Sequence, residues 1–308
     1  MTQLVVGVDG GGSKTRVIVA DDSGRELATL TGAASAVRPG EVLHSAEVIG
    51  ALVRDTLALA ELADARPRAL VVGVAGVGRE KERKALVRAL EGEGLAEELQ
   101  VVADAELAMT DAFGDGPGVL LISGTGSVAF GRSPTGAFKR CGGWGPDCGD
   151  EGSGAWIGRR ALSVVTSSHD EREPGTRLVG AVLTALELEE VDGLVAWAAQ
   201  ASPKDLAALA VPVVTLASER DLRANSICTL AAEELVLHVR TLARQLFVDE
   251  RAAVPVALAG GMLQRGSFLR RLVEHRLKSA VPGAQLHGEE VVPARGAVKL
   301  AQRLLAGV

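Results

Sequence analysis

The stretch that decides the fold stands near the start of the chain, where residues 4–20 read LVVGVDGGGSKTRVIVA. Two apolar runs, residues 4–8 and 16–20, flank a turn that contains three consecutive glycines. A second turn, Asp22-Ser23-Gly24, leads into a third extended run at residues 25–29. Extended runs separated by short turns of this composition are typical of hairpins. The pattern predicts three consecutive antiparallel strands.

The segment after the hairpins alternates between helix and strand. Apolar residues recur at helical spacing over residues 42–57, and a charged amphipathic helix is predicted over residues 79–90. Short apolar strands are predicted at residues 70–74 and 99–103, the second ending directly before Asp104 and a further helix. The first part of the chain therefore has the order βββαβαβα.

The same order begins again in the second half of the chain. A constant offset carries DGGGS at residues 9–13 onto SGTGS at residues 123–127, with two glycines and the serine identical. Further on, VAG at residues 74–76 is echoed by LAG at residues 258–260. Two echoes in the same sequence order indicate a duplicated domain.

We therefore predict an α/β protein of two duplicated βββαβαβα domains that face each other across a cleft and offer their glycine turns to one ligand. The first domain is expected to cover residues 1–114 and the second residues 115–308. A helical insertion at about 155–225 lengthens the second domain. Its final helix, residues 294–305, either stays there or returns to the first domain.

Composition excludes several classes of function. The 308 residues are 47% apolar and 23% charged, with no apolar run long enough for a membrane span and no signal peptide at the start. A net charge of −6 leaves no basic footprint for nucleic acid and no polybasic patch for a membrane. The three cysteines lack a CxxC pair, and the five histidines fall in no metal-ligand spacing. A cytoplasmic enzyme with reduced thiols is the expectation.

Glycine turns between strands allow positive φ and let backbone N–H groups approach a phosphate. A Walker A loop would need glycine directly before Lys-Ser/Thr and a helix afterwards, whereas Ser13 precedes Lys14-Thr15 here and a strand follows. The dinucleotide fingerprint also requires a following helix. Two tight hairpin turns without a ligand remain the alternative.

Four motifs together carry a resemblance to a known family: GVDGGGSKT at 7–15, SGTGS at 123–127, GGWGPDCGDEGS at 142–153 and AGG at 259–261. In this order they resemble the N-acetylglucosamine kinase branch of the BadF/BadG/BcrA/BcrD-type ATPase family, within the actin, sugar kinase and Hsp70 superfamily. The resemblance covers essentially the whole chain, and residues 142–153 are its most specific part. It implies ribonuclease H-like, actin-like ATPase lobes around a nucleotide cleft.

The resemblance also implies an activity. The protein is expected to use ATP and Mg²⁺ to transfer the γ-phosphoryl group to a hydroxyl, at C6, of an amino sugar such as N-acetylglucosamine or glucosamine. Its partners would be the small sugar substrate and, as one option, a second copy of the chain in a homodimer. Neither nucleic acid nor a membrane is expected as a partner.

Two carboxylates suit phosphoryl transfer, which needs positioning, charge neutralisation and an acceptor for the hydroxyl proton. Asp9 ends the first strand beside a glycine turn and could hold hydrated Mg²⁺ through water. A turn-initiating aspartate is the alternative. Asp104 begins where a strand meets a helix, which suits a general base or, alternatively, a helix N-cap. The family places its catalytic aspartate at this spacing before the second glycine turn.

Residues expected to bind ATP lie in or beside glycine turns: Gly11, Gly12, Ser13, Lys14 and Thr15 on the first, Gly124, Thr125 and Gly126 on the second, and Gly260, Gly261 and Gln264. The last three lie against the adenosine in the family. Lys14 alone is weak evidence, because a lysine after a turn is usually only solvated. Tight helix–strand packing is the alternative for the Gly260-Gly261 pair.

Residues expected to bind the sugar gather around the most specific motif: Ser35, Asp104, Ser127, Val128, Gly143, Trp144, Gly145 and Asp150. Trp144 can present a flat apolar wall to a pyranose, or it can anchor the loop. Asp150 can accept a sugar hydroxyl, whereas either it or Glu151 could instead cap the helix that begins near Ser153.

The chain departs from its relatives at three of these places. Family members usually carry asparagine in the loop after the third strand and directly after the second glycine turn, where this chain has Ser35 and Val128. They often carry histidine where this chain has Pro146. Each change removes a hydrogen-bonding group, so the preference among sugars is expected to differ.

Two other classes of function stay open. An activator of a radical dehydratase, also of the BadF type, would carry an iron–sulfur cluster on cysteines after the second glycine turn and would act as a dimer. Cys141 and Cys148 flank Trp144, but the sugar-kinase motif surrounds them. A nucleotide-gated binding module of the Hsp70 kind would usually add a peptide-binding domain, whereas this chain ends after one further helix.

Overall fold

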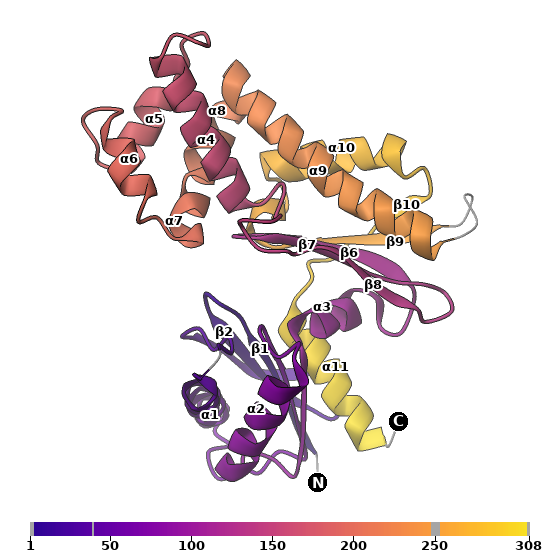
Figure 1. The fold of residues 1–308 in the computed structure, drawn as a ribbon. Helices are drawn as coiled ribbons and strands as arrows, with labels where there is room; N and C mark the ends of the chain where they lie inside the picture. Colours follow the sequence, from indigo (N-terminus) through magenta and orange to yellow (C-terminus); the bar gives the residue numbers. More distant parts are fainter. Residues whose placement is uncertain (1–2, 39, 248–252, 307–308) are drawn as a thin grey trace. The chain divides into compact units, whose positions relative to one another are not determined.

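A computed structural model describes residues 3–38, 40–247 and 253–306. The described chain divides into two compact units, drawn in Figure 1. The first runs to Asp115 and takes in the residues from Val291 onward, and the second is Gly116–Glu290. Of the helices described, none has the length and apolar character that crossing a membrane requires.

The first unit is built on a five-stranded sheet with the order β3-β2-β1-β4-β5. Its strands are β1 (Leu4–Gly10), β2 (Thr15–Asp21), β3 (Glu26–Gly32), β4 (Ala69–Val74) and β5 (Glu98–Ala103). The first three strands pair antiparallel, as the sequence predicts, and β4 and β5 continue the sheet in parallel from β1.

Helices cover both faces of this sheet, which explains why its inner strands read as nearly continuous apolar runs. On one face, Val6 and Val8 pack in a core with α1 (Val42–Leu59) and α2 (Glu80–Glu93). On the other face, Val5 and Ile18 share a core with α3 (Asp104–Phe113) and α11 (Pro293–Ala306).

The sequence pattern does not decide whether the last helix belongs to the second domain or to the first. In the structure this helix, α11, belongs to the first unit. It packs against α3 and β1. Glycines permit the close approach: a Cβ on Gly7 would lie 2.5 Å from the carbonyl oxygen of Ala294, and one on Gly296 would lie 1.9 Å from that of Leu107. The second unit thus ends at Glu290 and not at residue 308.

The second unit repeats the topology of the first, with the sheet order β10-β9-β6-β7-β8. Its strands are β6 (Gly118–Ser123), β7 (Ser127–Arg132), β8 (Phe138–Gly142), β9 (Val254–Ala259) and β10 (Ala284–Leu286). Taken in chain order, these strands occupy the places of β1 to β5. The turns after the fourth strands also correspond, since Gly76 has a φ of +94° and Gly260 a φ of +91°. The predicted duplication is confirmed.

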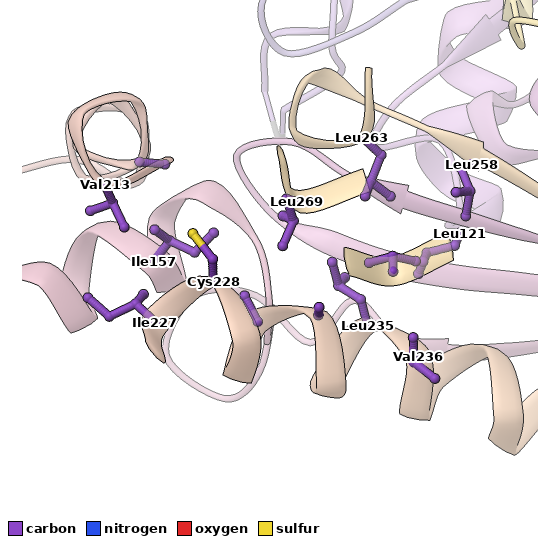
Figure 2. Packing of buried hydrophobic residues seen from close by; sticks show 14 of the residues in the cluster. Leu121, Ile157, Val213, Ile227, Cys228, Leu235, Val236, Leu258, Leu263 and Leu269 are labelled. Carbon is purple, nitrogen blue, oxygen red and sulfur yellow. The ribbon is translucent and has the colours of Figure 1, made fainter. Parts of the chain in front are cut away.

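Helices α9 (Leu222–Leu246) and α10 (Phe268–Ala280) pack together, and α9 lies along β6, β7 and β8. A short 3₁₀ turn, η1 (Gly261–Leu263), follows β9. Figure 2 shows one continuous core in which Leu121 and Leu258 from the sheet meet Leu235 and Leu269 from these helices.

The helical insertion joins the same core through Ile157 and Val213 (Figure 2). It consists of α4 (Gly154–His169), α5 (Leu178–Ala185), α6 (Gly193–Ala198), α7 (Pro203–Ala208) and α8 (Ala210–Ser218). It ends earlier than the sequence suggests, because Leu222 already begins the long helix that covers the sheet.

Candidate active site

The first glycine turn presents its tip to solvent. It joins β1 to β2, and Gly12, Ser13 and Lys14 are exposed. The N–H of Gly11 donates to the carbonyl of Lys14 at 3.0 Å and closes the turn. An added Cβ on Gly12 would meet no atom within 4 Å, so the backbone there is open to a ligand.

Thr15 and Ser35 lie beneath this turn instead of on it. Both are buried, at 0% and 2% exposure, and their hydroxyl oxygens are 2.7 Å apart. Thr15 Oγ1 is also 2.6 Å from the carbonyl oxygen of Ala33. The backbone of Ser35 donates to the carbonyl of Gly11 at 3.2 Å. In the structure these two hydroxyls tie the loop after β3 to the glycine turn. Contact of Thr15 with phosphate and of Ser35 with the sugar stays a prediction.

Asp9 lies in β1 directly before the glycine turn and is half-buried. Burial raises its pKa to about 6, and the charge of Asp104 raises the pKa as well, while Lys14 and Arg16 oppose the shift. The two carboxylates therefore share one electrostatic environment on the first unit. Neighbouring carboxylates with raised pKa values mark a place that favours a cation or a proton.

Asp104 is the first residue of α3, and its Oδ1 accepts the N–H of Ala105 at 2.9 Å. The N-cap position belongs to Ala103, which has no capping side chain, and the Asp104 carboxylate satisfies one N–H group of the first turn. The residue keeps an exposed side. Desolvation by the surrounding protein still raises its pKa, against backbone hydrogen bonds that lower it. The carboxylate is both reachable and a better proton acceptor than an ordinary aspartate.

The second glycine turn is held by the start of α4. The N–H groups of Gly154 and Ala155 donate to the carbonyls of Gly124 and Thr125, at 2.8 and 3.2 Å. Because the first N–H groups of a helix have no partner inside it, the turn supplies them with acceptors. Thr125 is exposed, and an added Cβ on Gly124 would meet no atom within 4 Å. At these two positions the described residues leave room for a ligand.

The turn after β9 packs directly on the second glycine turn. A Cβ on Gly260 would lie 2.3 Å from the carbonyl oxygen of Ser123, and its φ of +91° also favours glycine. Gly261 and Gln264, next to it, are exposed. Tight packing thus accounts for the glycine at position 260. The same packing places the exposed residues Gly261 and Gln264 beside the second glycine turn.

The loop at residues 142–153 is fastened to the same glycine turn. Ser127 Oγ donates to the carbonyl of Glu151 at 2.7 Å, and Ser123 Oγ to that of Gly152 at 3.1 Å. Ser153 caps α4 by accepting the N–H of Trp156 at 3.2 Å. Neither Asp150 nor Glu151 is the cap.

Asp150 is buried in this loop with a φ of +59°, an uncommon conformation for a residue other than glycine. Its carboxylate accepts the backbone N–H groups of Ser127 and Gly145. Burial raises its pKa, and these hydrogen bonds oppose the rise. A carboxylate has about four acceptor positions, so two remain for a ligand.

Trp144 is 68% exposed and does not anchor the loop in a core. The guanidinium of Arg140 lies 4.8 Å from the centre of its ring, a cation–π contact. Val128 supports the loop from below, since a Cβ on Gly143 would lie 2.8 Å from its Cγ2. A supported, exposed indole suits stacking on a ligand.

Each unit therefore carries its own group of candidate residues. Asp9, Asp104 and the exposed tip of the first glycine turn belong to the first unit. The second glycine turn, the Gly260 turn and residues 142–153 belong to the second. The sequence profile of the BadF/BadG/BcrA/BcrD ATPase family matches residues 6–301. The chain belongs to this family.

Two curated proteins resemble this chain over most of its length. An N-acetyl-D-glucosamine kinase of Dictyostelium discoideum is 30% identical over 97% of this chain and 98% of its own. An N-acetylmuramic acid/N-acetylglucosamine kinase of Clostridium acetobutylicum is 29% identical over 87% of this chain and 88% of its own. A solved structure from Chromobacterium violaceum, provisionally named N-acetylglucosamine kinase, is 28% identical, with a TM-score of 0.80 over 97% of this chain and 99% of that one.

In this family member the cysteines and histidines form no metal cluster within the described residues. Cys141 is half-buried, Cys148 is exposed and Cys228 is buried, and all three are free thiols. One of the histidines has a position that the sequence does not predict. His238 is buried on α9, under the loop at residues 142–153.

Proposed function

We propose that the protein is an ATP-dependent kinase that transfers the γ-phosphoryl group to the C6 hydroxyl of an amino sugar. The observation that carries the proposal is the direct packing of Asp150 against Gly126, where a Cβ would lie 2.6 Å from Asp150 Oδ2. A carboxylate suited to sugar hydroxyls thus adjoins a turn suited to phosphate. The names of the two curated relatives support a kinase that acts on an amino sugar.

Binding of ATP falls to the exposed backbone of the glycine turns. The N–H groups around Gly12 and around Gly124 can approach phosphate oxygens because no side chain stands in the way. Lys14, exposed at the first turn, adds a positive charge. Gly261 and Gln264 flank the adenosine.

The donor set on the first unit fits Mg²⁺, which prefers few protein carboxylates and keeps its waters. Asp9 would hold the ion through water, since its carboxylate is half-buried beside the first glycine turn. When bound, the ion neutralises charge on the phosphates. Because ATP is the phosphoryl donor, the cytoplasm is the proposed site of action.

Asp104 is the proposed general base. Its carboxylate accepts the proton of the sugar hydroxyl while that oxygen attacks the γ-phosphorus and ADP leaves. The pKa of Asp104 is raised and therefore lies closer to the pH of the reaction than that of an ordinary aspartate. A general base accepts a proton more effectively when its pKa is near that pH.

Recognition of the sugar falls to Trp144 and Asp150. The exposed indole provides an apolar wall for one face of the sugar ring, and the Asp150 carboxylate accepts hydrogen bonds from sugar hydroxyls. Val128 and Pro146 have no side-chain group that could hydrogen-bond to the sugar. We therefore expect the enzyme to accept several amino sugars and not N-acetylglucosamine alone. Glucosamine and N-acetylglucosamine are the first candidates.

The proposal is tested by measuring ADP release from Mg·ATP with glucosamine, N-acetylglucosamine, N-acetylmannosamine, N-acetylmuramate or glucose as acceptor. We expect at least one amino sugar to accelerate ADP release well above the rate in water alone. The Asp9→Ala variant should lose turnover with every acceptor, because Asp9 serves the nucleotide. If none of the five sugars accelerates ADP release in the wild type, the proposal is wrong.

A further inference from the structure

His238 is a buried titratable residue that the proposed reaction does not use. It lies on α9 with 7% exposure. Its Nδ1 is 2.7 Å from the carbonyl oxygen of Glu234, one turn earlier in the helix. A carbonyl oxygen can only accept, so Nδ1 carries a proton and donates it. The other ring nitrogen, Nε2, is left for a different partner.

That other nitrogen meets the loop at residues 142–153 near both of its ends. Near the end of the loop, Nε2 is 3.8 Å from Glu151 Oε2. At the start, a Cβ on Gly142 would lie 2.4 Å from Nε2 and 2.6 Å from Cδ2 of the imidazole. Gly142 also has a φ of +74°. The imidazole therefore fills the space beneath one end of the loop and faces a carboxylate at the other.

Two further residues of α9 pack against the loop near its other end. A Cβ on Gly152 would lie 2.5 Å from Cγ of Leu235 and 2.6 Å from the carbonyl oxygen of Ala231. Ala231, Leu235 and His238 follow the spacing of one helix face. Of these three residues, His238 has the polar side chain, and its Nε2 lies 3.8 Å from Glu151, the residue next to Asp150.

We propose that His238 is a positioning residue: by contacting Gly142 and Glu151 it holds the loop so that Asp150 presents its carboxylate to the sugar. This inference rests on the proposed function for its substrate. The imidazole takes no part in the chemical step, and its effect reaches the sugar through the loop.

A pair of substitutions separates the two ring nitrogens. His238→Asn keeps an N–H near the position of Nδ1 and removes the group at Nε2, whereas His238→Gln retains a polar group near Nε2. We expect His238→Asn to lower kcat/KM for the sugar by about ten- to a hundredfold, as small misplacements of binding groups do. The KM for ATP should stay nearly unchanged. His238→Gln should recover most of the loss.

Val239→Ala is the matched control, because Val239 is the next residue of α9 and fully buried. It should lower the thermal unfolding midpoint without raising the sugar KM. If His238→Asn does not fold, Gly142→Ala disturbs the same contact from the loop side and should cause the same selective loss. An unchanged sugar kcat/KM in the folded variants would overturn the proposal.

Hydrogen–deuterium exchange distinguishes a failure of this proposal from a failure of the proposed function. Backbone amides of residues 142–153 should exchange faster in His238→Asn than in the wild type or in Val239→Ala, whether or not any sugar is phosphorylated. If no sugar is a substrate but exchange rises, the proposed function fails and the positioning of the loop stands. Unchanged exchange across the loop would overturn the positioning role itself.

Discussion

Gly126 and Asp150 are packed so closely that a Cβ on the glycine would lie 2.6 Å from Oδ2 of the aspartate. The first residue belongs to the second glycine turn and the second to the loop at residues 142–153. The carboxylate is buried and accepts two backbone N–H groups, so it has little freedom to move aside. A change in the turn must therefore reach the carboxylate.

The Gly126→Ala variant should lose sugar binding as well as ATP binding. The added methyl group displaces Asp150 and weakens its hydrogen bonds, each contributing about 0.5–1.5 kcal/mol. We expect the sugar KM to rise about tenfold or more by steady-state kinetics. Gly124→Ala offers a contrast, because its Cβ would meet no protein atom within 4 Å and should affect the ATP KM alone. Identical sugar KM values in the two variants would contradict the coupling.

The Asp9→Asn variant should be more stable than the wild type at neutral pH. Burial raises the pKa of Asp9 to about 6 in the folded chain, whereas an unfolded aspartate titrates near 4. Ionisation therefore costs the folded state free energy, and stability falls as pH rises through this interval.

Removing the charge should raise the free energy of unfolding by roughly 1–3 kcal/mol at pH 7.5 without Mg²⁺. The gain should shrink as pH falls from 6 towards 4. Denaturant titrations at several pH values measure it, and a gain independent of pH would show that Asp9 is not desolvated as described.

The Asp104→Asn variant should retain ATP binding and lose catalysis. Asparagine is nearly isosteric and still accepts the N–H of Ala105, so α3 should begin unchanged. It cannot take the hydroxyl proton. We expect kcat to fall by about a hundredfold or more, with the dissociation constant for Mg·ATP nearly unchanged by calorimetry. Near-normal turnover would remove Asp104 from the role of base.

The Trp144→Ala variant should weaken sugar binding without destabilising the fold. The indole is 68% exposed and its described ring contact is with Arg140, so its removal leaves no core cavity. The sugar KM should rise about tenfold while the unfolding midpoint stays within error. Trp144→Phe keeps an aromatic face and should lie between. A sugar KM that does not respond would assign Trp144 to another role.

Local pattern was enough to predict the strands around residues 4–20 and the repeat of that arrangement at residues 123–127. Strand and turn preferences depend on a few neighbouring residues, so they can be recognised in a single sequence. The position of Asp104 at a strand–helix junction was predictable for the same reason.

Contacts between distant segments were not predictable in this way. Thr15 and Ser35 are expected to bind ATP and the sugar, and no local pattern shows that their hydroxyls hydrogen-bond to each other. Similarly, Gly7 and Gly296 show no sequence sign that they admit α11 to the first sheet. His238 looks like any helix-face histidine until Gly142 is seen to pack on it.

The fate of the γ-phosphoryl group tests the central claim most directly. The wild type is incubated with Mg²⁺, ATP labelled in its γ-phosphoryl group and the best acceptor of the sugar panel, and the products are separated and identified. The account predicts that the label appears on the 6-hydroxyl of the amino sugar in step with ADP, and that Asp104→Asn forms almost none. Release of the label entirely as inorganic phosphate would contradict it, because the protein would then be an ATPase and not a sugar kinase.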